Sequence, residues 1–166
     1  MEYDGNITLH KNSDRSYSPE SYLMQLRITS KKLSDRLVEL GMMQAKTKII
    51  TFPKYFSVEI CKHFIRGYFD GDGCISLTKR KQMVISIAST KEFCEGIQEI
   101  VKNECNIPGN VSFHRNIYYY AFSGNTQVKR FMNFLYSDGG LCLYRKRDKY
   151  LNSLKEIYGN DQQNNL

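Results

Sequence analysis

Apolar residues along this chain recur with two different periods, and the switches between them predict its elements. Alternation predicts strands, and recurrence at helical spacing predicts helices. The predicted strands are residues 5–12, 22–29, 74–80, 83–89, 110–116 and 117–124. The predicted helices are residues 30–41, 57–71, 91–105, 125–136 and a basic stretch at 141–158. Ser30, Ser57 and either Ser89 or Thr90 are placed to cap helix starts.

The first predicted strand has a counterpart later in the chain. Residues 5–12 (GNITLHKN) and 109–116 (GNVSFHRN) share four identical positions, and the other four are conservative changes. Each is followed by a second strand and a helix. In the first copy we expect Ile7 and Leu9 to be buried on one face of a half-buried strand.

The repeat predicts how the chain is divided. Residues from about 57 to 150 read as a complete αββαββα unit, whereas residues 5–48 match only its second half. We therefore expect an α+β protein with a partial repeat at 1–52, a complete repeat at 53–158 and a frayed tail at 159–166. At 166 residues the chain is long enough for one compact domain.

Charge and cysteine usage narrow the function classes. The net charge of +7 and the pI of about 9.1 favour a polyanionic partner, most simply nucleic acid. The five cysteines form no CxxC pair, which indicates reduced thiols in an intracellular protein. No apolar run approaches the roughly 20 residues of a membrane span, and the first residues do not form a signal peptide.

The predicted helix at 57–71 ends in an acidic, glycine-flanked turn. Gly67 and Gly71 share its face, and glycine inside a helix costs about 1 kcal/mol relative to alanine, so a close approach of another helix backbone is the expected reason. Asp70 and Asp72 beside glycine backbone predict a hard-cation site. A solvated turn is the alternative. An EF-hand is excluded, because its glycine and glutamate positions hold Ile75 and Lys81.

Residues 65–73 (IRGYFDGDG) resemble the LAGLIDADG motif of homing endonucleases, which mobile introns and inteins encode. Arg66 departs from the small residue usual there, and Gly71 replaces alanine. The resemblance implies an antiparallel β-hairpin saddle with helices on one face, and two such helices packed side by side through Gly67 and Gly71. It implies that Asp72 is the catalytic residue and binds Mg²⁺ with the Gly71 carbonyl. Asp70 is interpreted as a turn or packing residue.

The resemblance also implies basic residues near the scissile phosphates and strands that read double-stranded DNA. Lys46 and Lys146 occupy matching places after two of the helices, and we interpret them as catalytic. Polar residues that alternate along the strands are interpreted as base-reading: Ser76, Thr78, Arg80, Gln82, His10, Asn12, Gln25, Arg27, Ser112, His114 and Asn116. The expected phosphate partners include Lys79, Lys81 and Arg145.

The sequence contains one clear acidic helix, whereas the resemblance calls for two. Two chains pairing through helix 57–71 as a homodimer, a fragment, or an incomplete site would each account for this. A stub at residues 1–5 could also place Asp4 in the second catalytic position. The rival function is a protein of the same fold that binds DNA or RNA without cutting, such as a transcription regulator or an intron maturase.

Overall fold

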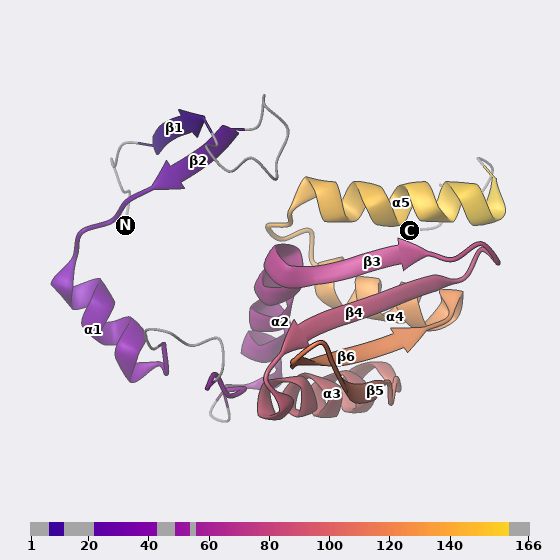
Figure 1. Ribbon diagram of the computed structural model, residues 1–166, viewed down its shortest axis with the longest axis horizontal. Helices are drawn as coiled ribbons and strands as arrows, with labels where there is room; N and C mark the ends of the chain where they lie inside the picture. Colours follow the sequence, from indigo (N-terminus) through magenta and orange to yellow (C-terminus); the bar gives the residue numbers. More distant parts are fainter. Residues whose placement is uncertain (1–6, 12–21, 43–48, 54–55, 160–166) are drawn as a thin grey trace. The chain divides into compact units, whose positions relative to one another are not determined.

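The computed structural model describes residues 7–11, 22–42, 49–53 and 56–159. The chain divides into two compact units, Met1–Met42 and Met43–Leu166, and each has its own architecture (Figure 1). No helix in these ranges is long and apolar enough to cross a membrane.

The N-terminal unit contains a two-stranded sheet and one helix. β1 (Ile7–Lys11) pairs antiparallel with β2 (Tyr22–Leu26), with Thr8 opposite Gln25. α1 (Lys31–Glu39) starts after Ser30, whose hydroxyl oxygen accepts a hydrogen bond from the Leu33 amide at 3.2 Å. The predicted cap is confirmed, and the second strand ends three residues earlier than predicted.

The burial expected for the first strand is wrong. Ile7 and Leu9 are 62% and 63% exposed, and α1 contains no buried residue. A strand of a two-stranded hairpin has one hydrogen-bonded neighbour, and such a hairpin buries an apolar face only when another layer packs on it. Alternation therefore identified the strand without deciding whether its apolar side is covered.

The C-terminal unit has the predicted αββαββα order, followed by one more helix. Its helices are α2 (Val58–Asp72), α3 (Lys91–Cys105), α4 (Asn125–Tyr136) and α5 (Tyr144–Tyr158). Its strands are β3 (Gly73–Leu77), β4 (Met83–Ser89), β5 (Asn110–His114) and β6 (Ile117–Ser123). Thr90, not Ser89, caps α3, and its hydroxyl oxygen accepts from the Phe93 amide at 3.2 Å.

The four strands form one antiparallel sheet in the order β3-β4-β6-β5 (Figure 1). The first and third strands of the unit are therefore its two edges, and β4 and β6 lie in the middle. Ile85 pairs with Phe122 and Ile87 with Tyr120, so all four side chains share one face of the sheet. Helices α2, α3 and α4 cover that face, and α5 packs beside β3.

The hydrophobic core lies between this face and the helices. Its buried aromatic rings pack edge to face: Phe69 of α2 lies 5.3 Å from Phe131 of α4, which lies 5.3 Å from Phe122 of β6. Fully burying a side chain of this size contributes about 1.5–3 kcal/mol. The core thereby fixes the end of α2 relative to the sheet, and the motif residues lie at this end.

Candidate functional site

The last turn of α2 carries the acidic residues, and the strand follows without a separate turn. α2 continues through Asp72, and β3 begins at Gly73, whose amide donates to the Phe69 carbonyl. A Cβ at position 73 would lie 2.1 Å from the Phe69 ring and 2.6 Å from its carbonyl oxygen. Glycine is therefore required where the helix passes directly into the strand, and this junction fixes Asp72 beside the sheet.

Asp72 is exposed and makes no hydrogen bond or ion pair with another described residue. The C-terminal end of a helix carries a partial negative charge, and its last carbonyls lack helical partners. The Asp72 carboxylate and the exposed backbone of Gly71 therefore offer oxygen donors of the kind that Mg²⁺ prefers. Within the described residues no group of three or more His, Cys, Asp or Glu side chains could hold a metal. The Asp72 carboxylate and the Gly71 carbonyl therefore fit part of the coordination shell of Mg²⁺.

Gly67 and Gly71 leave one face of α2 open. A Cβ at either position would meet nothing within 4 Å, so neither glycine is required by packing within this chain. Ile60, on the same face, is 50% exposed. Phe64, also in α2, packs against Phe52 at 5.7 Å between ring centroids.

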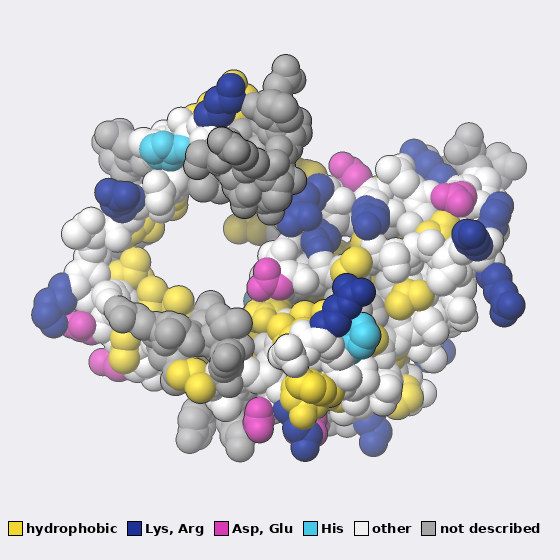
Figure 2. All heavy atoms as spheres, viewed as in Figure 1, with side chains coloured by type: hydrophobic (Ala, Val, Ile, Leu, Met, Phe, Trp, Pro, Cys, Tyr) yellow, Lys and Arg dark blue, Asp and Glu magenta, His cyan; other side chains and the backbone are white. Residues whose placement is uncertain are grey.

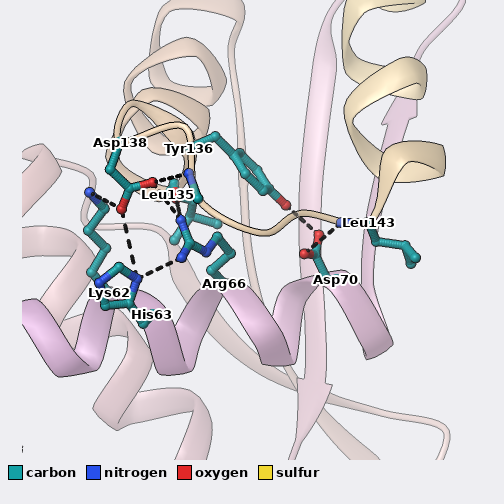
Figure 3. Close-up of polar contacts among 9 residues, drawn as sticks. Lys62, His63, Arg66, Asp70, Leu135, Tyr136, Asp138 and Leu143 are labelled. Carbon is teal, nitrogen blue, oxygen red and sulfur yellow. Dashed lines mark hydrogen bonds and ion pairs between the residues drawn. The ribbon is translucent and has the colours of Figure 1, made fainter. Parts of the chain in front are cut away.

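Asp70 has a different environment from Asp72. Its Oδ1 accepts a hydrogen bond from the Tyr136 hydroxyl at 2.5 Å, and its Oδ2 accepts from the Leu143 amide at 3.0 Å (Figure 3). Burial, followed by the Asp70 carboxylate, raises the pKa of Tyr136. Both Asp70 oxygens are therefore occupied by the segment that joins α4 to α5.

Arg66, which departs from the motif, reaches the same segment from one turn earlier in α2. It is 8% exposed, and its Nη1 donates to the Leu135 carbonyl at 3.0 Å and to Asp138 Oδ1 at 2.7 Å (Figure 3). Its Nη2 lies 2.7 Å from His63 Nδ1, which must accept because a guanidinium only donates. We call Arg66 and Asp70 together the α2 anchor.

Other groups besides Arg66 contact the Asp138 carboxylate. The Gly140 amide donates to its Oδ1 at 2.9 Å, and Lys62 Nζ lies 3.0 Å from its Oδ2. The Gly140 amide first, then Lys62 and Arg66, hold the pKa of this carboxyl well below its usual range. A Cβ at Gly140 would lie 2.7 Å from Arg66 Nη2, so the buried guanidinium also limits which residue fits there.

Lys146 lies in the first turn of α5 and is only 7% exposed. Its Nζ lies 5.5 Å from the centre of the Phe69 ring, a cation–π contact at the end of α2. Burial and then Arg145 lower its pKa, while Cys74 and Asp70 oppose that shift. Lys146 is thus fixed near the α2–β3 junction. Lys46, Asp4 and Asn12 lie outside the described residues.

The predicted base-reading residues that the structure describes are exposed, but several lie off the regular strands. Ser76 and Ser112 lie on strands β3 and β5. β3 ends at Leu77, and the hairpin is closed by the Gln82 amide, which donates to the Thr78 hydroxyl oxygen at 3.1 Å. Thr78, Arg80 and Gln82 therefore lie in the β3–β4 connection, together with Lys79 and Lys81.

The structure also changes what was expected of Lys81 and Asn116. Lys81 donates from Nζ to the Glu156 carbonyl at 3.0 Å, so its ammonium contacts α5. Asn116 lies in the β5–β6 turn with a φ of 64°, one residue beyond Arg115 and two beyond the strand end at His114. Two successive positive φ angles are typical of a tight hairpin turn, which strand alternation alone does not reveal.

In the N-terminal unit, the nominated side chains of His10, Gln25 and Arg27 are exposed, and Thr8 contacts two of these residues. The Thr8 hydroxyl donates to the Gln25 carbonyl at 3.3 Å, and His10 Nε2 lies 3.0 Å from the Thr8 hydroxyl oxygen. Arg27 follows β2 and is exposed.

In the C-terminal unit, Arg145 lies in the first turn of α5 and is exposed as well.

Sequence reasoning did not nominate the two middle strands. The open face of the sheet includes Ser86 of β4 and Tyr119 and Ala121 of β6, all half-buried, and Ser86 pairs with Ala121. The alternation of residues 83–89 already separated Ser86 from Ile85 and Ile87, so the signal was present. In Figure 2 much of the face of the sheet turned to the viewer is uncharged, one Lys or Arg side chain and a His lie on it, and further Lys and Arg side chains lie along α5.

A model of the LAGLIDADG-like domain family matches residues 59–135. Residues 59–135 form a LAGLIDADG-like domain. This domain begins in α2 and ends in α4, so it contains the whole sheet, Asp72 and the α2 anchor. The recognition of the motif and the α+β fold class are thereby confirmed. α5, with Lys146, lies beyond the matched residues.

The fold is similar to that of a solved structure. The homing endonuclease I-WcaI, bound to its DNA recognition sequence, matches with a TM-score of 0.56 at 16% identity, over 89% of this chain and 64% of its own. I-CvuI in complex with the I-CreI target matches with a TM-score of 0.45 at 18% identity, over 60% of this chain and 67% of its own.

Full-length DUF199/WhiA from Thermatoga maritima matches with a TM-score of 0.49 at 16% identity, over 91% of this chain and 43% of its own. The chain thus spans less than two thirds of the I-WcaI and WhiA chains. A search of curated proteins found no match.

Proposed function

We propose that this chain is a divalent-metal-dependent endonuclease that hydrolyses phosphodiester bonds in double-stranded DNA. The observation that carries the proposal is the exposed, unpaired Asp72 carboxylate at the end of α2 in a LAGLIDADG-like domain. Asp70, two residues earlier, has both oxygens occupied, so Asp72 is the carboxylate of the motif that is available to a cation.

Asp72 and the Gly71 carbonyl would hold the metal, which we propose to be Mg²⁺. A bound divalent cation supplies charge stabilisation to the phosphodiester and lowers the pKa of the attacking water. Lys146 places a second positive charge at the α2–β3 junction, where it can balance the charge of a scissile phosphate. Lys46, which occupies the matching place in the partial repeat, is proposed to do the same.

The open face of α2 supports a homodimer. One carboxylate and one carbonyl leave most of a metal shell unfilled, and a second copy packed against Gly67 and Gly71 would bring a second Asp72 to the same place. Substituting either glycine by leucine would prevent close approach, and the Cβ of the new side chain would meet nothing within 4 Å in this chain. We expect Gly67→Leu to lower the mass measured by light scattering from that of a dimer to that of a monomer.

The open face of the sheet is the proposed DNA-binding surface. The uncharged face would contact bases, and exposed basic residues at its borders, such as Arg80, Lys79 and Arg145, would contact phosphates. The net charge of +7 supports this, and binding should weaken steeply with salt. By resemblance we extend the proposal to an origin in a mobile intron or intein. The five free thiols support an intracellular location.

The deciding experiment compares Asp72→Asn with Glu59→Gln, which removes an exposed carboxylate at the other end of α2. We expect Asp72→Asn to slow single-turnover cleavage of a duplex target by about a hundredfold or more, since several kcal/mol of charge stabilisation is lost. Glu59→Gln should cleave normally, and both should bind the duplex as the unchanged chain does. Undiminished cleavage by Asp72→Asn would refute the proposed site.

A second candidate is a protein of this fold that binds nucleic acid without cutting it. The observation that favours it is that the described residues contain one exposed motif carboxylate and no cluster of metal ligands. Metal-dependent nicking of supercoiled plasmid separates the two functions. Tight binding of duplex DNA without nicking in Mg²⁺ or Mn²⁺ would favour a regulator, and preference for structured RNA would favour a maturase.

A further inference from the structure

The α2 anchor reaches the α4–α5 segment from a helix face that the metal site does not use. Arg66 and Asp70 lie four residues apart, one helical turn, and both point toward residues 135–143 (Figure 3). Arg66 binds the beginning of the segment through Leu135 and Asp138. Asp70 binds its two ends, through the Tyr136 hydroxyl and the Leu143 amide.

Leu143 is the point at which this segment becomes α5. It is the N-cap residue of that helix, and its carbonyl accepts from the Lys146 amide at 2.9 Å. α5 has no hydrogen bond from a capping side chain of its own. The Asp70 carboxylate therefore supplies, from another helix, the anchor that the start of α5 lacks.

The position of Lys146 depends on where α5 starts. It lies three residues after Leu143, in the first turn, with its ammonium over the Phe69 ring. The groups that act electrostatically on it include Asp70 and Cys74, which lie two residues before and two residues after Asp72 in the chain. A shift at Leu143 would consequently move this ammonium relative to the α2–β3 junction.

We propose that Asp70 is a positioning residue of the nuclease site, which holds Tyr136 and Leu143 so that the first turn of α5 places Lys146 at the α2–β3 junction. This inference rests on the proposed function and deepens it. A long lysine side chain loses about 2 kcal/mol of rotamer freedom when it is fixed, and the buried position provides that order before DNA binds. Misplacing a catalytic group by about 1 Å can slow a reaction about a hundredfold.

The placement can be measured without DNA or metal. Amine labelling of the folded chain, followed by mass spectrometry, compares buried Lys146 with exposed Lys149 in the same helix. We expect Lys146 to react at least about tenfold more slowly than Lys149 in the unchanged chain, since its reaction needs a local opening. Asp70→Asn should raise the Lys146 rate several-fold and leave Lys149 unchanged.

Asp70→Asn retains the shape of the side chain but removes its negative charge, which weakens both hydrogen bonds, and it turns one acceptor into an amide donor, so that the Tyr136 hydroxyl would have to accept instead of donate. Tyr136→Phe is a milder second variant that removes one of the two hydrogen bonds and leaves the carboxylate in place. It should raise the Lys146 rate by a smaller factor. Glu99→Gln and Tyr158→Phe, at exposed positions of α3 and α5, are matched controls that should change neither rate. Unchanged Lys146 labelling in both test variants would overturn the proposal.

Cleavage kinetics test whether the placement serves catalysis. We expect Asp70→Asn to slow single-turnover cleavage at saturating DNA by about tenfold to a hundredfold, while the Kd for duplex DNA stays within about twofold. A normal cleavage rate together with faster Lys146 labelling would overturn the positioning role. If the unchanged chain does not cleave, the proposed function fails, and the labelling result still decides whether Asp70 holds Lys146.

Discussion

The two hairpins that share a sequence repeat differ in how far they are buried. In β1, Ile7 and Leu9 are more than half exposed, and Met24 of β2 is 69% exposed. In the matching hairpin, Val111 of β5 is half-buried and Tyr120 of β6 is fully buried. Similar alternation thus gives a solvent-exposed ribbon in one unit and part of a core in the other.

The difference comes from the layer behind each hairpin. β5 and β6 join a four-stranded sheet, and α3 packs on both of them. Tyr120 fills the space beside Gly109, where a Cβ would lie 2.3 Å from its ring, and its hydroxyl donates to the Ile107 carbonyl at 3.3 Å. The β1–β2 sheet has two strands, and α1 has no buried residue. A repeat in sequence therefore predicts local structure but not stability.

The largest expected effect tests this contrast directly. Tyr120→Ala should cost about 3–5 kcal/mol in the free energy of unfolding, because it leaves a cavity and an unpaired Ile107 carbonyl. Met24→Ala should change it by about 0.5 kcal/mol or less, as expected for an exposed side chain. Urea denaturation of the full chain measures both. Comparable losses in the two variants would show that the β1–β2 hairpin is buried in solution.

An intermediate effect concerns the ion pairs of the two units. Arg66→Met should cost about 2–3 kcal/mol, because the Leu135 carbonyl loses its buried donor and Asp138 loses one of its partners. Arg36 pairs with Glu39 at 2.8 Å on the surface of α1, so Arg36→Met should cost about 0.5 kcal/mol or less. The same denaturation series measures both variants. Equal costs would contradict a structural role for the α2 anchor.

The smallest expected effect is a dependence of stability on pH that comes from the C-terminal unit. Because the folded pKa of Asp138 is lowered, its contribution is fully present above the ordinary value of 3.8 and is lost as pH falls through the folded pKa. Asp138→Asn does not titrate, so its stability should fall less between about pH 5 and about pH 2. Asp35→Asn, in the exposed pair of α1, serves as the control. Parallel pH curves for Asp138→Asn and the unchanged chain would refute this account.

Much of the candidate site was readable from local sequence. The motif at residues 65–73 predicted the acidic end of α2, and the resemblance separated Asp72 from Asp70 by role. The hydrogen-bond partners of Arg66 could not be predicted from the sequence, because Leu135 and Asp138 lie 69 and 72 residues away in the chain. Lys146 was nominated from the repeat, but its burial over Phe69 depends on how α5 docks beside β3.

The sequence by itself determined the order of elements, their caps and the motif, because periodicity, capping residues and glycine act over one or two turns. Only the tertiary structure decided which edges β3 and β5 occupy, which hairpin is buried, and why position 66 holds an arginine. Those outcomes depend on which apolar faces meet and on where a buried charge finds its partners. Contacts between residues distant in the chain set both, and no local pattern encodes them.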